Sequence, residues 1–250
     1  MPVWVVIAAF NEGRVIADVV AGVARRGYPV VVVDDGSSDD TALRASTWAD
    51  SRPKDGVASL AYSRPKDGVA SRVASLAYVV RHPLNLGQGA ALQTGIDFAL
   101  QQGAEIIVTF DADGQHRAGD IERLVAALHE SPADFALGSR FLGRAIAISI
   151  SRRLLLRAAT LFTRLTTGLR LTDTHNGLRA MTRRGAERIR LRQNRMAHAS
   201  EILSQIAASG LPYVEVPVRI EYTAYSVGKG QRLGDALTIL LDLFARRLTR

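Results

Sequence analysis

The chain has 250 residues, and 47% of them are hydrophobic, which is enough for one sizeable α/β core. Lys and Arg outnumber Asp and Glu by 32 to 24, so the formal charge of +8 favours anionic partners such as phosphorylated substrates, acidic lipid headgroups or nucleic acid. The absence of cysteine excludes disulfides and thiolate metal sites, and it is compatible with a reducing cytoplasm.

The first half of the chain alternates short β-branched runs with amphipathic stretches of helix length. The run Val3–Ala8 predicts a strand rather than a secretory signal, because neither a basic segment nor a small-residue cleavage site accompanies it. The predicted elements that follow are a helix at Glu12–Arg26, a strand at Val30–Asp34 with a short helix after it, a strand at Ser75–Arg81, a helix at Gly87–Gln102, a strand at Glu105–Phe110 and a helix at Ala118–Glu130. This βαβα rhythm predicts an α/β fold with a mostly parallel sheet covered by helices on both faces.

A duplicated segment interrupts this rhythm. The run SRPKDGVAS at Ser51–Ser59 recurs at Ser63–Ser71, a repeat too short to form a solenoid. Its Pro, Lys, Asp and Gly residues suit a surface loop, where added length is tolerated. We therefore expect a loop insertion near residues 50–74 within a single domain.

Two amphipathic helices are predicted in the second half, at Ser149–Thr167 and Arg232–Thr249. The first helix has an apolar face flanked by arginines, and this face consists of Leu154, Ala158, Leu161 and Leu165. Packing against the core and contact with a membrane interface both fit such a pattern. No run of about 18 apolar residues is free of charges, so we expect any membrane contact to be peripheral.

Polar clusters directly follow three of the predicted strands, at Asn11-Glu12, at Asp34-Asp35-Gly36-Ser37 and at Asp111-Ala112-Asp113. In an open parallel sheet, ligands bind beyond the carboxyl ends of the strands, so the three clusters should face one crevice.

Asp111 and Asp113 point the same way from an extended chain, and Gln115 can follow them. Hard oxygen ligands at this spacing suit Mg²⁺ or Mn²⁺, although acidic pairs at strand ends also serve as turn formers or helix caps.

The other two segments suit a nucleotide. The cluster that begins with Asp34 has an alternative role, in which its Gly and Ser residues make a turn and Ser38 or Asp39 caps the next helix. The two adjacent carboxylates are explained if Asp35, supported by Asp34, binds a base or ribose. Gly87 and Gln88 open a helix whose N-terminal N–H groups can meet an anion. This is not a Walker loop, because no GK[ST] follows.

Together these runs resemble family 2 glycosyltransferases, most closely the dolichyl and polyprenyl phosphate mannosyl- and glucosyltransferases. The resemblance is carried by AAFNE (8–12), VVDDGSSDDT (32–41), NLGQGAALQTGI (85–96), DADGQH (111–116), GSR (138–140) and DTHNGLRA (173–180). It implies a single GT-A (Rossmann-like) catalytic domain over residues 1–250. Residues 1–140 would form the nucleotide-sugar and metal-binding half, residues 141–231 the acceptor-binding half and residues 232–250 a C-terminal amphipathic helix.

The resemblance also implies the ligands and their residues. The donor would be a GDP- or UDP-hexose, and Mg²⁺ or Mn²⁺ would be held by Asp111, Asp113 and Gln115. The donor site would consist of Ala8, Asn11, Glu12, Asp34, Asp35, Gly87, Gln88, Asp111 and Ala112.

A lipid phosphate acceptor is already ionised at neutral pH, so positioning and charge compensation can replace a strong general base. The candidate catalytic residues are Asp113, Arg140 and Lys229. The candidate ligands of the acceptor phosphate are Arg140, Arg152, Arg153, Arg179 and Lys229, although a given arginine is more often solvated or ion-paired. A single displacement would invert the anomeric configuration.

Two alternatives remain. A soluble glycosyltransferase acting on a small hydroxyl acceptor would use the same donor site with Glu201 or another carboxylate as its base, and His198 lies on the same helix face as Glu201. A basic nucleic-acid-binding module fits the charge but is disfavoured by an aromatic content of 6% and by the acidic clusters. We therefore expect no nucleic-acid partner and a cytoplasmic enzyme bound peripherally to the inner face of the membrane.

Overall fold

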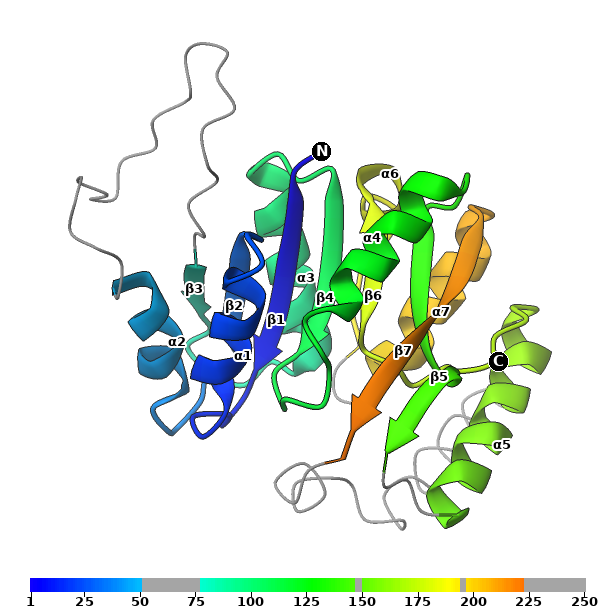
Figure 1. Ribbon diagram of the computed structural model, residues 1–250, viewed down its shortest axis with the longest axis horizontal. Coiled ribbons are helices and arrows are strands. Elements are labelled where there is room, and N and C mark those ends of the chain that lie inside the picture. The colour runs from blue at the N-terminus through cyan, green and yellow to red at the C-terminus, as the bar shows by residue number, and fades with distance from the viewer. Residues whose placement is uncertain (51–76, 147–149, 194–196, 223–250) are drawn as a thin grey trace.

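The computed structural model describes residues 1–50, 77–146, 150–193 and 197–222 (Figure 1). Its centre is a seven-stranded sheet of order β3-β2-β1-β4-β6-β5-β7. The strands are β1 (Val3–Ala9), β2 (Val30–Asp34), β3 (Ala77–Arg81), β4 (Ile106–Asp111), β5 (Phe135–Ile146), β6 (Arg179–Thr182) and β7 (Tyr213–Glu221). The helices are α1 (Ile16–Ala24), α2 (Thr41–Asp50), α3 (Gln88–Gln101), α4 (Asp120–Glu130), α5 (Ile150–Thr167), α6 (Arg183–Ala186) and α7 (Ala197–Ser209).

The alternation of side chains along the strands builds two cores, one on each face of the sheet. In β1, Val5 and Ile7 pack with α1, α2 and α4, whereas Trp4 and Val6 pack with α3 and α7. Because both faces are covered, the central strands are almost wholly apolar. The predicted α/β class and the mostly parallel sheet are confirmed.

One strand runs against its neighbours. Strand β6 is antiparallel to both β4 and β5, while β1 pairs in parallel with β2 and β4. The amino end of β6 therefore lies at the same edge of the sheet as the carboxyl ends of β1, β2 and β4. Strands β5, β6 and β7 were not predicted from the sequence pattern.

Helix α1 begins at Ile16, later than the predicted start at Glu12. The N–H groups of Asn11, Glu12 and Gly13 donate to side chains that follow β2, namely those of Ser37, Thr41 and Asp39 respectively. Asn11 also has a φ of 55°, which turns the chain sharply after β1. This network ties the ends of β1 and β2 together.

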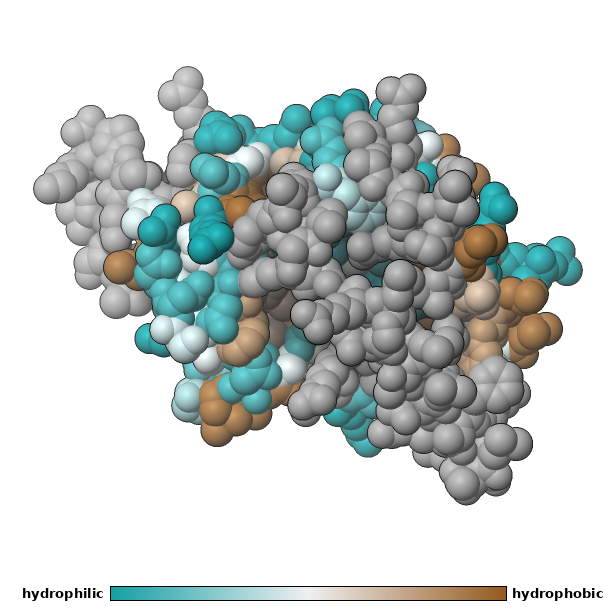
Figure 2. Space-filling view, turned by 90° about the horizontal axis from the view of Figure 1, so that it is seen from below, coloured by the Kyte–Doolittle hydropathy of each residue, from teal (hydrophilic) through white to brown (hydrophobic). Residues whose placement is uncertain are grey.

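Helix α5 tests whether its predicted apolar face packs against the core. Leu156 and Ala159 are buried, but Leu154, Leu161 and Leu165 are exposed by 61%, 58% and 74%. Figure 2 shows hydrophobic residues at the right of the view, where α5 lies. The predicted apolar face is thus not core, and none of the helices in the described ranges is long and apolar enough to cross a bilayer.

The duplicated segment at 51–76 and the predicted helix at 232–250 lie outside the described residues.

Candidate functional site

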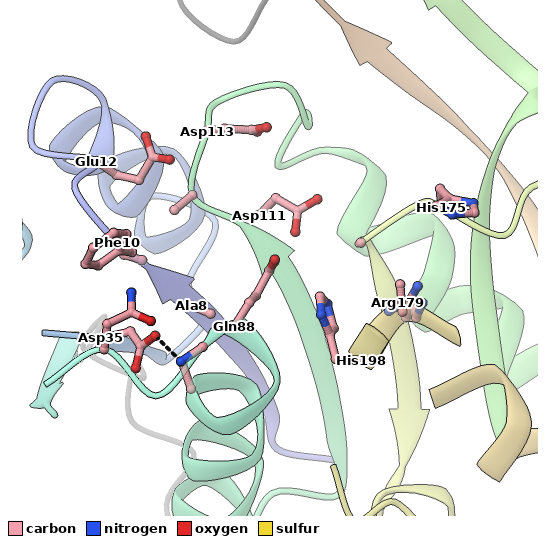
Figure 3. Close-up of a pocket in the computed structure, with 17 residues that line it drawn as sticks. Ala8, Phe10, Glu12, Asp35, Gln88, Asp111, Asp113, His175, Arg179 and His198 are labelled. Carbon is pink, nitrogen blue, oxygen red and sulfur yellow. Dashed lines mark hydrogen bonds between the residues drawn. The ribbon is translucent and has the colours of Figure 1, made fainter. Parts of the chain in front are cut away.

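A pocket of about 430 Å³ opens at the edge of the sheet where β1, β2 and β4 end (Figure 3). Residues that follow β1 and β4 line the pocket, and so do residues that precede the antiparallel strand β6. Its lining consists of Ala8, Ala9, Phe10, Glu12, Asp35, Asn85, Gly87, Gln88, Ala91, Asp111, Ala112, Asp113, His175, Gly177, Arg179, His198 and Ala199. Most of the donor-site residues that the resemblance implies are therefore brought together.

Asp35 lines the pocket, but its carboxylate also shapes the wall. Its Oδ1 accepts from the N–H of Leu86 at 3.0 Å and lies 2.8 Å from Nδ1 of His82, and its Oδ2 accepts from the N–H of Gly87 at 2.7 Å (Figure 3). Gly87 has a φ of 96°, which an L side chain rarely adopts, and it directly precedes α3. Asp35 thus fixes the loop that presents the N-terminus of α3 to the pocket.

Asp34 and Asn11 are not brought into the pocket. Asp34 is fully buried, where its Oδ1 accepts from the N–H of Ser37 and its Oδ2 pairs with Arg81 at 3.0 Å. The side-chain oxygen of Asn11 accepts from the N–H of Ser38. Both side chains therefore support the loops of the pocket, and neither residue belongs to its lining.

The two aspartates of DADGQH both line the pocket, but their pKa values are shifted in opposite directions. Burial opposes ionisation of Asp111, yet a hydrogen bond from His116 and the charges of His116 and Arg179 outweigh it and lower its pKa. For Asp113, burial and the charge of Asp111 together raise the pKa. Asp111 is thus the firmly ionised member of the pair.

The residues present fit a divalent cation completed by a substrate. Two carboxylates that repel each other in a partly buried site are relieved by a cation, and Mg²⁺ needs only one or two when a diphosphate supplies further oxygens. Among the described residues, no group of three His, Asp or Glu side chains forms a complete metal site. Gln115 does not line the pocket, and its Nε2 donates to Oδ2 of Asp113 at 2.6 Å.

The opposite wall of the pocket is basic. Arg179 on β6 lies between His175, which precedes β6, and His198 on α7 (Figure 3). Burial lowers the pKa of Arg179, and the charges of Asp111 and Asp173 offset this only in part. Burial also lowers the pKa of His175. Arginine stays protonated at neutral pH even when its pKa is lowered, so Arg179 is the group on this wall that can receive an anion.

The sequence predicted Arg179 as a phosphate ligand and His198 on the same helix face as Glu201. His175 was missed as a site residue, and its one signal was its position inside the DTHNG run.

Arg140 lies behind the basic wall rather than in the pocket lining. Its Nε donates to the buried carboxylate of Asp173 at 2.6 Å, and its two terminal nitrogens donate to the hydroxyl of Tyr222 and the carbonyl of His175, each at 2.7 Å. The charge of Asp173 overcomes the effect of burial and raises the pKa of Arg140. The structure thus does not show Arg140 as an acceptor ligand, because its guanidinium already holds the His175 turn.

Among the remaining candidates that the structure describes, Glu201 does not line the pocket. Glu201 points away from it, since its carboxylate accepts from the N–H groups of Arg192 and Gln193. The side chains of Arg152 and Arg153 and the whole of Lys229 lie outside the described residues.

Comparison with known proteins shows which proteins the chain is similar to. The profile of "Glycosyl transferase family 2" matches residues 4–190. The chain is 33% identical to an uncharacterized protein of Methanocaldococcus jannaschii, over 98% of this chain and 92% of that protein. It is 31% identical to the UDP-N-acetylglucosamine–dolichyl-phosphate N-acetylglucosaminyltransferase of Methanococcus voltae, over 91% of this chain and 89% of that protein.

One further relative and one solved structure also match most of the chain. The polyprenol monophosphomannose synthase of Mycolicibacterium smegmatis is 28% identical, over 93% of this chain and 83% of that protein. The crystal structure of glucosyl-3-phosphoglycerate synthase from Mycobacterium tuberculosis with Mn²⁺ and UDP-glucose superposes with a TM-score of 0.62, covering 98% of this chain and 78% of that chain. At 17% identity, this likeness shows a shared fold.

Proposed function

The chain belongs to glycosyl transferase family 2, and we propose that it transfers a hexose, mannose or glucose, from GDP- or UDP-sugar to a polyprenyl or dolichyl phosphate. The observation that carries this proposal is the division of the pocket. Asp111 and Asp113 lie on one side, and Arg179 with His175 and His198 lies on the other. The lipid acceptor is supported by the names of two relatives, which mention dolichyl-phosphate in Methanococcus voltae and polyprenol monophosphomannose in Mycolicibacterium smegmatis.

The acidic side would hold the donor through a divalent cation. Asp111 and Asp113 are the proposed ligands of Mg²⁺ or Mn²⁺, with Gln115 a ligand if its amide leaves Asp113. Such an ion would offset the negative charge that develops on the leaving diphosphate. The nucleoside would lie against Ala8, Glu12 and the wall shaped by Asp35.

The basic side would hold the acceptor. An Arg179 guanidinium between two imidazoles can bind the phosphate and offset its repulsion from the diphosphate of the donor. The acceptor oxygen is already ionised, so the protein has only to place it in line with the anomeric carbon. A single displacement then inverts the anomeric configuration, and a retained anomer in the product by NMR would contradict this mechanism.

We propose a peripheral position on the inner face of the membrane, and α5 supports the contact with a membrane surface. The exposed stripe of Leu154, Leu161 and Leu165 offers an apolar face, and the exposed Arg157 and Arg164 stand beside it. Apolar insertion and attraction to acidic headgroups both favour adsorption of such a helix. The acceptor's prenyl chain would then remain in the bilayer while its phosphate reaches the pocket.

The test is a donor panel of GDP- and UDP-sugars, including UDP-N-acetylglucosamine, with Mn²⁺ or Mg²⁺ and a short polyprenyl phosphate. We expect metal-dependent transfer that disappears in the Asp111→Ala, Asp113→Ala double variant. Transfer to a soluble hydroxyl acceptor but not to the lipid phosphate would contradict the proposed acceptor, and undiminished transfer by the double variant would contradict the metal site.

A further inference from the structure

The residue opposite Asp111 across the sheet is a glycine. Strands β4 and β6 pair in an antiparallel register that matches Val108 with Ala180 and Thr109 with Arg179. Continued by two residues toward the pocket, this register places Asp111 opposite Gly177, just before β6 begins. Directly opposed residues of antiparallel strands carry their side chains on the same face, with Cβ atoms about 4.5–5.5 Å apart. Any side chain at position 177 would therefore stand beside that of Asp111.

The carboxylate of Asp111 already occupies that space. A Cβ atom added to Gly177 would lie 2.2 Å from each carboxylate oxygen of Asp111 and 2.5 Å from its Cγ. Contacts of this length are not tolerated, so even a methyl group would force the carboxylate to move. The rotamer of Asp111 therefore depends on the absence of a side chain at its cross-strand neighbour.

The backbone of Gly177 is also anchored to the strand that carries Asp111. The Oγ1 atom of Thr109 donates to the carbonyl of Gly177 at 2.7 Å, and Thr109 lies two residues before Asp111 on the same face of β4. A second restraint comes from the buried His116, whose Nε2 lies 2.9 Å from Oδ2 of Asp111. His116 thus contacts the carboxylate directly, while Thr109 fixes the glycine that leaves room for it.

We infer that Gly177 is a positioning residue, which keeps the Asp111 carboxylate aimed into the pocket for the divalent cation. The DTHNG turn then serves two walls of the pocket at once. It supplies His175 to the basic wall, and its glycine leaves room for the carboxylate on the acidic wall. This inference rests on the metal-dependent function proposed above.

The test measures Mn²⁺ affinity by electron paramagnetic resonance, with UDP or GDP present, for wild type and Gly177→Ala. We expect the variant to keep its circular dichroism spectrum but to bind Mn²⁺ at least about tenfold more weakly, since changes behind a metal ligand typically have effects of this size. The matched control is Gly22→Ala, where the added methyl would meet only Cβ of Ala118 at 4.0 Å among the described residues and where we expect no change.

A second pair of variants keeps the inference falsifiable if Gly177→Ala does not fold. Thr109→Val removes the anchoring hydroxyl and should weaken Mn²⁺ binding, whereas Thr109→Ser retains the hydroxyl and should bind nearly as well as wild type. Equal Mn²⁺ affinity of wild type and a folded Gly177→Ala, or of wild type and Thr109→Val, would overturn the positioning role alone. Failure of the wild type to bind Mn²⁺ would overturn the proposed metal dependence and this inference with it.

Discussion

The guanidinium of Arg140 donates through Nε to the carboxylate of Asp173 over 2.6 Å, and both side chains are almost fully buried. The same carboxylate accepts from the N–H of Arg140, and the other end of the guanidinium binds the carbonyl of His175. Removing one member of such a pair leaves a buried charge without compensation. The pair therefore links the stability of the fold to the geometry of the basic wall.

We predict that Arg140→Met lowers the free energy of unfolding by about 3–5 kcal/mol, because Asp173 is then buried without its partner. The double variant Arg140→Met, Asp173→Asn should lose less stability than the sum of the single variants. Urea denaturation of the four proteins measures this coupling, with the exposed Arg170→Gln as a control. If Arg140→Met is inactive yet as stable as wild type, Arg140 acts on the substrate directly.

A second prediction concerns Asp113, whose pKa is raised by burial and by the charge of Asp111. A raised pKa means that the folded state disfavours the ionised form, so ionisation at neutral pH destabilises the fold. Asp113→Asn should thus melt at a higher temperature than wild type in metal-free buffer and transfer sugar about 100-fold more slowly. The surface variant Glu130→Gln should change neither value, and a lower melting temperature for Asp113→Asn would contradict the assignment.

The third prediction separates the two walls of the pocket. Arg179→Met should raise KM for polyprenyl phosphate about 10- to 100-fold, the effect of losing charge-assisted hydrogen bonds to a phosphate. The KM of the sugar donor should change far less, because Arg179 lies on the wall opposite Asp113. Initial rates at varied acceptor and donor concentrations distinguish the two constants. A selective rise in donor KM would move Arg179 to the donor diphosphate.

The fourth prediction addresses the exposed face of α5. Replacing Leu154, Leu161 and Leu165 with Ser should reduce co-sedimentation with anionic liposomes about tenfold or more, because their apolar surface no longer enters the bilayer. The melting temperature should stay close to that of wild type, since all three side chains are exposed. Leu43→Ser, at a leucine of α2 that is 68% exposed, is the matched control. Unchanged liposome binding of the triple variant would remove α5 from the membrane contact.

A fifth prediction concerns pH and the end of β6. Arg184 donates to both carboxylate oxygens of Asp134, and Thr182 donates to Oδ1 at 2.6 Å. The hydrogen bond from Arg184 lowers the pKa of Asp134 below its ordinary value of 3.8, so this stabilisation is present above that value and is lost as the pH falls through the lower folded-state pKa. Asp134→Asn should therefore be less stable than wild type at pH 7, and the difference should shrink below about pH 4. A constant difference across this range, by thermal melting, would contradict the assignment.

The first half of the fold followed from the sequence because its signals are local. The bounds of β2, at Val30–Asp34, match the prediction, since a continuous valine run ends at an acidic turn. The second half depends on pairing between distant segments. Strand β6 has only four residues, and β7 contains Pro217, which weakens the pattern of a strand and is tolerated because β7 lies at the edge of the sheet.

The residues of the site that local sequence signals mark were predictable, and those that depend on distant segments were not. The rule that ligands gather at strand ends located Glu12, Asp111 and Asp113. The sequence favoured Asp35 over Asp34 for the nucleotide, but it did not predict that the Asp34 side chain is buried against Arg81 while Asp35 binds the N–H of Gly87, because both partners lie far along the chain. His175 was missed because its approach depends on the reversed direction of β6.

The reversal of β6 also has an evolutionary consequence. Residues that precede this strand enter the pocket on one loop, whereas the donor wall is built on the separate loops that leave β1, β2 and β4. If the basic wall receives the acceptor as proposed, acceptor preference can diverge among relatives by changes within residues 173–179, provided that Gly177 is kept, without any change in the residues proposed to bind the nucleotide. Grafting this one heptapeptide between paralogues would be an economical route to enzymes that glycosylate new phosphates.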